Sequence, residues 1–247
     1  MSKSEALVLY GVGSPNVVKV GILLEELARD YELRYVAVFK GDQFKPELLA
    51  MNPLGKVPVL VDPAFGRPLY ESGAILVYLA ERSGRFLPDR GPDRYEVIEW
   101  VMVQMANIGP MFGQLNHFRQ ALQPGEEPYA EARFAQASQT LYRVLDERLR
   151  AQTWIAGGAY SIADMAIYPW ALYLERHGFA PADYPALIRW RDTIAARPAV
   201  IRANARFQEA FADKSNRDRK AATDAELDLL FGRGSFAPPK DFSRVRG

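Results

Sequence analysis

Two short segments near the start of the chain constrain its fold most. In the first, Asn52-Pro53-Leu54-Gly55-Lys56-Val57-Pro58-Val59-Leu60, a turn places Pro58 at the start of a short apolar strand. The second, Glu71-Ser72-Gly73-Ala74-Ile75, is an acid and a predicted helix cap ahead of an apolar run. Together they predict a cradle for a small peptide. Its amides can pair with the backbone at Val57, and its carboxylate can bind the helix N-terminus at Ser72.

The first 85 residues alternate between strand and helix patterns. Strands are predicted at 6–10, 33–39, 58–61 and 68–70, and helices at 16–29 and 72–83. A helix between the first two strands predicts a parallel pair with a right-handed crossover, and the turn at 62–66 predicts an antiparallel pair. This βαβ-then-ββα order is the thioredoxin arrangement.

After a linker at 88–92 the strand patterns stop. Helices are predicted at 95–122, 129–151, 162–177, 184–196 and 199–212. We therefore predict an α/β thioredoxin-like domain at 1–87, an all-α helical-bundle domain at 88–212 and a C-terminal extension at 213–247. Aromatic residues of the second domain, including Trp170, are expected mostly in its core.

Two capping boxes mark helix starts in the second half of the chain. Ser161-Ile162-Ala163-Asp164 is interpreted as a structural signal, not a catalytic one. Thr223-Asp224-Ala225-Glu226 predicts a short amphipathic helix in the extension, with Leu227, Leu230 and Phe231 on its apolar face. That face should pack on the body of the protein, because it would otherwise be stranded in solvent.

Composition excludes several classes of function. The chain has 31 basic and 30 acidic side chains, and this near balance argues against a nucleic-acid partner. No apolar run approaches the ~20 residues of a membrane span. The start, Met1-Ser2-Lys3-Ser4-Glu5, lacks the apolar core of a signal peptide, so a cytoplasmic location is expected. His117, one of two histidines, has no Cys, Asp or Glu partner at ligand spacing, so no metal site is expected.

The chain contains no cysteine. Protein disulfides, thiolate metal sites and a protein thiol nucleophile are therefore excluded. Any sulfur chemistry has to use a sulfur atom that arrives with the ligand.

Several motifs carry a resemblance to a known family. Tyr10-Gly11-Val12-Gly13-Ser14-Pro15-Asn16, Lys19, Lys40-Gly41-Asp42-Gln43-Phe44, Gly109-Pro110-Met111-Phe112-Gly113-Gln114 and Asn116-His117-Phe118 resemble the bacterial Nu class of glutathione transferases. This class includes disulfide-bond oxidoreductases and is related to the transferase-like domain of the yeast prion nitrogen regulator. The resemblance covers about residues 6–212. The chain departs from the pattern at Ser14, usually Thr, and at Leu54, usually Asn.

The resemblance implies a set of site residues. Ser14 and Asn16 would stabilise the glutathione thiolate, although Ser-Pro-Asn is also a common helix-capping sequence. Tyr10 is the alternative thiolate contact, because other transferase classes use a tyrosine near the end of that strand. Pro58 is expected to be cis. The residues expected to bind glutathione are Gln43, Lys56, Val57, Glu71 and Ser72, together with Arg133, which would reach across a homodimer. A second-substrate pocket is expected at Met105, Asn107, Met111, Phe112 and Tyr168.

The activity implied first is reduction of small disulfides with two bound glutathiones, or with oxidised glutathione. Glutathione conjugation, or thioether or aryl-ether cleavage of hydrophobic electrophiles, is the enzymatic alternative. A regulatory module that binds glutathione without turnover is the non-enzymatic one.

Overall fold

A computed structural model of the protein describes residues 6–156, 158–232, 241 and 243–246. Its sheet has the order β2-β1-β3-β4 and consists of β1 (Leu7–Gly11), β2 (Tyr31–Tyr35), β3 (Val59–Val61) and β4 (Pro68–Tyr70). β1 pairs in parallel with β2 and antiparallel with β3, which pairs antiparallel with β4. The helices of this half are α1 (Pro15–Glu26), α2 (Pro46–Met51) and α3 (Ser72–Ser83). The predicted thioredoxin-like domain is confirmed.

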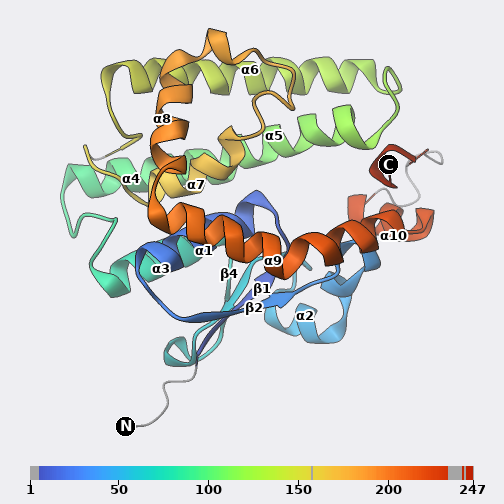
Figure 1. Cartoon of the computed structure of the whole chain (residues 1–247), viewed down its shortest axis with the longest axis horizontal. Helices are drawn as coiled ribbons and strands as arrows, with labels where there is room; N and C mark the ends of the chain where they lie inside the picture. The colour runs from blue at the N-terminus through green and yellow to red at the C-terminus, as the bar shows by residue number, and fades with distance from the viewer. Residues whose placement is uncertain (1–5, 157, 233–240, 242, 247) are drawn as a thin grey trace.

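The second half is helical, as predicted (Figure 1). Its helices are α4 (Pro92–Val103), α5 (Gly109–Asn116), α6 (Pro128–Ala151), α7 (Ile162–Ala171), α8 (Pro185–Ala195) and α9 (Pro198–Lys220). The predicted single helix at 95–122 is one continuous helical run with two π-helical turns, η4 (Gln104–Ile108) and η5 (His117–Ala121). Each π-turn shifts the helical register, and such turns are frequent at functional sites.

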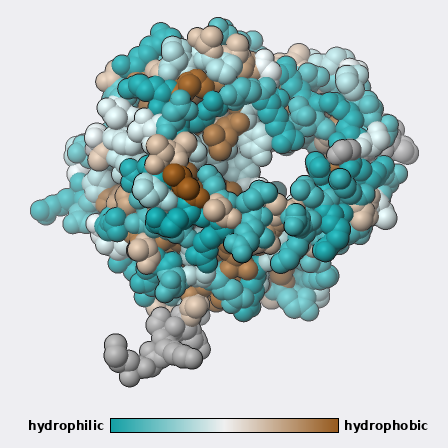
Figure 2. Space-filling view, viewed as in Figure 1, coloured by the Kyte–Doolittle hydropathy of each residue, from teal (hydrophilic) through white to brown (hydrophobic). Residues whose placement is uncertain are grey.

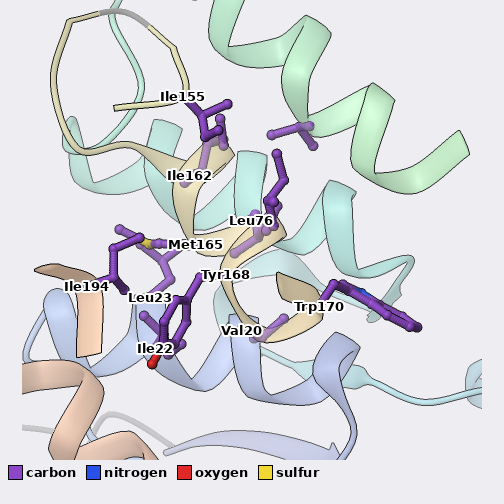
Figure 3. Packing of buried hydrophobic residues seen from close by; sticks show 14 of the residues in the cluster. Val20, Ile22, Leu23, Leu76, Ile155, Ile162, Met165, Tyr168, Trp170 and Ile194 are labelled. Atoms are coloured by element: carbon purple, nitrogen blue, oxygen red, sulfur yellow. The ribbon is translucent and has the colours of Figure 1, made fainter. Parts of the chain in front are cut away.

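The two halves share one hydrophobic core, centred on α7 (Figure 3). Figure 3 shows Met165 and Tyr168 of α7 close to Ile22 and Leu23 of α1, and these side chains are buried. Ion pairs reinforce the junction at its edge, where Arg197 binds Glu26 at 2.6 Å. The capping box at the start of α7 is confirmed, with Ser161 and Asp164 bonded reciprocally. The position of α7 therefore fixes how the sheet domain faces the helical domain.

Three predicted boundaries are wrong. The second strand ends at Tyr35 instead of 39, because the chain turns into a 3₁₀ turn at Val38–Lys40 (η1). The helix predicted at 162–177 ends at Ala171, shortly after Pro169, which cannot donate a backbone hydrogen bond. The helix predicted at 199–212 is α9, which continues to Lys220. The charged residues after 212 stay helical because Asp218 is buried and accepts a 2.9 Å hydrogen bond from the Tyr35 hydroxyl.

The C-terminal segment comprises α10 (Asp224–Phe231) and α11 (Ser243–Arg246). The predicted capping box of Thr223 and Glu226 is present, and Leu227 is fully buried. Leu227 belongs to a small cluster with Ala121, Leu122, Ala222 and Val245, against which Phe39, Phe118, Leu230 and Phe231 pack. The short helix thus packs on the same chain, as expected. Residues 233–240, 242 and 247 of the predicted extension lie outside the described residues.

Within the described ranges, no helix has the length and apolar character needed to cross a bilayer.

Candidate functional site

Strand register brings the predicted site segments to one edge of the sheet. Val59 of β3 pairs with Tyr10 near the end of β1 and with Tyr70 at the end of β4. β1 and β4 both run antiparallel to β3, so both end at the edge where β3 begins. α1 and α3 therefore both start at this edge, beside the turn that contains Val57. Their N-terminal N–H groups and dipoles favour a bound anion there.

The N-terminus of α1 leaves a hydroxyl available. Ser14 is the N-cap residue, with extended backbone angles of φ −101° and ψ 154°, but its side chain makes no capping hydrogen bond. Its backbone C=O accepts from the N–H groups of Val17 and Val18 at 3.0 and 2.9 Å. The half-buried Ser14 hydroxyl therefore does not cap α1, although the sequence left that role open.

Asn16 is oriented by the helical domain. Its Oδ1 accepts a 3.2 Å hydrogen bond from Nε1 of Trp170 on α7. An indole nitrogen can only donate, so the atom of Asn16 that faces it is the oxygen. The Nδ2 amide group, with two donors, is left for another partner. Asn16 is thus a hydrogen-bond donor held in place at the first turn of α1.

The turn before β3 is held by one side chain. The Asn52 amide group accepts from the Leu54 N–H at 3.1 Å and donates to the Lys56 C=O at 2.8 Å. The Leu54 side chain is 55 % exposed, so the departure from the family pattern at this position leaves the turn intact. The Val57–Pro58 peptide is cis, as expected. Neither backbone group of Val57 takes part in a turn or loop hydrogen bond among the described residues.

The start of α3 differs from the prediction. Ser72 is the first residue of the helix, and the N-cap is Glu71, which has a left-handed backbone with φ +64° and ψ 106°. The prediction that Ser72 caps the helix is therefore wrong: its buried hydroxyl lies 3.8 Å from Sδ of Met105. Positive φ at a non-glycine residue is uncommon and clusters at ligand sites. The first N–H groups of α3 remain available to a carboxylate.

A buried lysine lies behind this edge. Lys19 is fully buried, and its Nζ donates to Oε1 of Gln104 at 2.5 Å and to Sδ of Met105 at 3.4 Å. Burial lowers the pKa of Lys19 to about 7, while the Glu71 carboxylate acts in the opposite direction. Lys19 therefore joins α1 to the π-turn η4 and places a titrating cation under the start of α3.

The other residues predicted to contact glutathione include Gln43, Arg133 and Tyr10, and their environments differ. Gln43 is buried, and its Oε1 has no partner among the described residues, which leaves an acceptor for a ligand. Arg133 is exposed on α6, so a contact across subunits stays a prediction. The Tyr10 hydroxyl accepts a 2.6 Å hydrogen bond from Arg34. Tyr10 alternates with the buried Leu9 and points to the opposite face of the sheet from it, so a thiolate contact is not supported.

The residues predicted for the second-substrate pocket lie in different environments. Phe112 is fully buried, with its ring stacked 4.2 Å from Tyr142, and Tyr168 packs against Trp190 in the core. A pocket role for these two side chains is not supported, because they face the interior. Met105 lies beside Ser72 at the start of α3. Asn107 is exposed and Met111 is half-buried.

A large cavity lies between the two domains beside Lys56. Its volume is about 760 Å³, and Figure 2 shows an opening through the molecule at this place, bordered by mainly hydrophilic residues. The wall draws on α5, η5, the end of α9 and the C-terminal segment, and includes Lys56, Gln114, His117, Tyr173, Arg176, Arg219, Phe231 and Arg244. Lys56 precedes Val57 directly, so the cavity adjoins the predicted peptide cradle. A cavity of this size holds a small organic molecule.

No group of three or more potential metal-ligating side chains occurs in the part of the chain that the structure describes. His117 lies in the cavity wall. His177 is buried, its Nδ1 lies 2.9 Å from the Tyr142 hydroxyl, and burial lowers its pKa to about 4. It is therefore a neutral core residue at ordinary pH.

Sequence reasoning missed the supporting residues of this site. Trp170 was expected in the core, and nothing local indicates its bond to Asn16. Lys19 gave a usable signal, because a lysine inside the run 17–24, whose other residues are all apolar or glycine, has to find a buried partner.

Comparisons with known proteins identify the family. Residues 5–81 match the family of the glutathione S-transferase N-terminal domain, and residues 97–198 match that of the C-terminal domain. The chain is 42 % identical to the disulfide-bond oxidoreductase YfcG of Escherichia coli over 200 residues, which are 79 % of this chain and 93 % of that protein.

Two solved structures are also similar. A glutathione transferase from Burkholderia graminis, with two glutathione molecules bound per subunit, superposes with a TM-score of 0.78 at 40 % identity, covering 85 % of this chain and 90 % of that one. A glutathione transferase from Pseudomonas putida, with one glutathione disulfide bound per subunit, superposes with a TM-score of 0.75 at 38 % identity. The match covers 82 % of this chain and 92 % of that one. From its matched domains and its fold, this chain belongs to the glutathione S-transferase family.

Proposed function

We propose that the protein reduces small disulfides with glutathione and activates the glutathione thiolate at Ser14 and Asn16. The observation that carries this proposal is the Trp170–Asn16 hydrogen bond, which leaves the Asn16 amide as an oriented donor at the N-terminus of α1. A relative at 42 % identity is a disulfide-bond oxidoreductase, and similar structures hold two glutathiones or glutathione disulfide.

The free energies that a helix N-terminus and a hydrogen bond contribute support thiolate activation at Ser14 and Asn16. A thiol with a pKa of about 8.5 is only a few per cent ionised at neutral pH, and lowering that pKa by about two units needs ~2.7 kcal/mol. A helix N-terminus contributes about 0.3–1 kcal/mol, rising to about 2 in a sheltered geometry. A hydrogen bond to a charged group contributes roughly 1.5–3 kcal/mol. Neither effect suffices comfortably alone, whereas the two together do.

The reaction uses two glutathiones because the chain has no thiol of its own. One glutathione thiolate attacks a sulfur of the substrate disulfide, the S–S bond breaks, and the leaving sulfur takes a proton to become the first product thiol. The second glutathione attacks the resulting mixed disulfide and releases the second product thiol. Two glutathiones are oxidised to one glutathione disulfide, and the substrate gains two electrons and two protons.

In this proposal the first glutathione lies along the sheet edge. Its amides pair with the backbone of Val57, its carboxylate binds the first N–H groups of α3 at Ser72, and Glu71 binds its ammonium group. Gln43 and Lys56 contact its other end. The second thiol or the disulfide occupies the 760 Å³ cavity that Lys56 adjoins.

We further propose a cytoplasmic homodimer of the Nu class in which Arg133 contacts glutathione held by the partner subunit. Arg133 is exposed and lies on α6, outside the sheet-edge site of its own chain. α4 also carries two large apolar side chains on its surface, Tyr95 at 65 % exposure and Met102 at 52 %. Their spacing of seven places them on one face of the helix, which suits a subunit interface.

Conjugation of glutathione to electrophiles is the second candidate, because the cavity wall also carries the aromatic rings of Phe118 and Tyr173. A direct test compares glutathione plus bis(2-hydroxyethyl) disulfide with glutathione plus 1-chloro-2,4-dinitrobenzene. The proposed function requires turnover of the disulfide at the higher kcat/KM. Turnover of the aryl halide alone would favour conjugation, and turnover of neither would indicate a binding module.

A further inference from the structure

The wall of the cavity carries charge of one sign. Four cationic side chains line it, Lys56, Arg176, Arg219 and Arg244, whereas its described lining residues include no Asp or Glu. A wall of one sign in a partly enclosed space focuses the field and raises the local concentration of oppositely charged solutes.

Two of these cations, Arg176 and Arg244, take part in no ion pair with another described residue. The Arg176 guanidinium lies 5.4 Å from the centre of the Tyr173 ring and is in none of the ion pairs of the described residues. Arg244 donates to the backbone carbonyls of Arg119 at 2.9 Å and of Leu122 at 2.6 Å. Carbonyl groups are neutral, so these bonds hold the guanidinium in place without cancelling its charge.

Part of this charge comes from the C-terminal segment. Arg244 lies on α11, beyond both matched family domains, which end at 81 and 198. The segment is anchored to the sheet domain, because Lys40 binds Glu226 at 3.0 Å, and to η5, because Arg244 donates to the Arg119 C=O. This arrangement places Phe231 and Arg244 in the cavity wall.

We propose that the cavity selects disulfides whose ends carry carboxylates, and that Arg176 and Arg244 are the residues that set this selectivity. The inference rests on the proposed disulfide reduction and assigns its substrate class. The S–S cleavage is unchanged: the carboxylates only bind, and electrons and protons move as described above.

Three disulfides of nearly equal length test the charge alone. They are 3,3′-dithiodipropionate, a dianion, bis(2-hydroxyethyl) disulfide, which is neutral, and cystamine, a dication. Each kcat/KM is divided by the uncatalysed rate constant with glutathione, because charge also alters intrinsic reactivity. At low salt we expect the dianion to exceed the dication by at least about tenfold, and the ratio to fall in 0.5 M salt.

The variants Arg176→Gln and Arg244→Gln should each lower the dianion-to-dication ratio by about fivefold. Arg90→Gln serves as the matched control, because Arg90 is exposed and does not line the cavity. A dianion-to-dication ratio near one in the wild type would overturn the proposal. So would a ratio that, in both variants, stays within twofold of the wild-type value.

A binding measurement separates this proposal from the proposed function. Calorimetric titration with 3,3′-dithiodipropionate and with cystamine, in the absence of glutathione, reports the charge preference without turnover. If none of the three disulfides is reduced, the proposed function fails while calorimetry still decides the selectivity. If disulfides are reduced but the dianion binds no tighter than the dication, only the selectivity fails.

Discussion

The indole Nε1 of Trp170 donates a 3.2 Å hydrogen bond to Oδ1 of Asn16, across 154 positions of sequence. The bond ties the helical domain to the first turn of α1 and leaves the Asn16 amide nitrogen as the outward donor. Because Trp170 acts through Asn16, it is a positioning residue.

Trp170→Phe keeps an aromatic ring and removes this donor. We expect kcat for disulfide reduction to fall about five- to tenfold while KM for glutathione changes less than about twofold, since one neutral hydrogen bond is lost. Trp100→Phe is the control, because the Trp100 ring packs against Arg148 away from Asn16. In the double variant Asn16→Ala/Trp170→Phe, Trp170→Phe should add no further loss. Additive losses would show that Trp170 does not act through Asn16.

Asn16→Ala removes a hydrogen bond to the thiolate itself. We expect kcat to fall roughly 10- to 100-fold, more than glutathione affinity falls, because the bond strengthens as charge develops on sulfur. Tyr10→Phe should leave kcat unchanged, since the Tyr10 hydroxyl is bonded to Arg34. Steady-state kinetics of the two variants with bis(2-hydroxyethyl) disulfide check this. The reverse result would identify Tyr10 as the activating group.

Lys19→Met should change how stability depends on pH. Burial holds the pKa of Lys19 at about 7, below its ordinary value of 10.5. Between these values the unfolded chain binds more protons, so Lys19 makes the free energy of unfolding rise with pH. Lys19→Met lacks this dependence. Relative to the variant, the wild type should gain about 2 kcal/mol between pH 7 and 9 in urea denaturation. Lys220→Met, at an exposed helix end, should retain the wild-type dependence. Parallel curves for wild type and Lys19→Met would contradict this.

Leu227→Ala tests the packing of the C-terminal segment. The fully buried side chain belongs to a small cluster, so we expect the Tm to fall by about 4 °C or more in a thermal scan followed by circular dichroism. Leu229→Ala is the matched control, because Leu229 is 49 % exposed on the same helix. Truncation after Ala221 should lower the Tm further. An unchanged Tm in the truncated protein would mean that the segment contributes nothing to stability.

Arg133→Gln tests the proposed contact between subunits. We expect KM for glutathione to rise about five- to tenfold with kcat nearly unchanged, because a charged partner of a carboxylate is lost. Arg143→Gln, exposed on the same helix, should behave as wild type. Sedimentation at micromolar concentration should show a dimer. A fully active monomer would rule out the contact.

Local patterns were enough to predict the sheet edge. The strands, the turn before Pro58 and the helix start near Ser72 each follow from short-range residue preferences, and strand pairing then brings them together. The N-cap was misplaced by one residue because Glu71 adopts a positive φ, which non-glycine residues rarely do. Phe112 was misassigned because the π-turn η4 shifts the helical register before it, so the side chain faces the core. Contacts such as Lys19–Gln104 depend on packing that one sequence does not display.

The opening beside Lys56 runs through the molecule between the two domains (Figure 2). Disulfide reduction consumes one disulfide and two glutathiones and releases two thiols and one glutathione disulfide, so six molecules enter or leave the site in each cycle. In a pocket with a single opening, a product that is leaving would block entry of the next substrate. A passage with two mouths separates arrival from departure, so turnover does not require the C-terminal segment to swing away in every cycle.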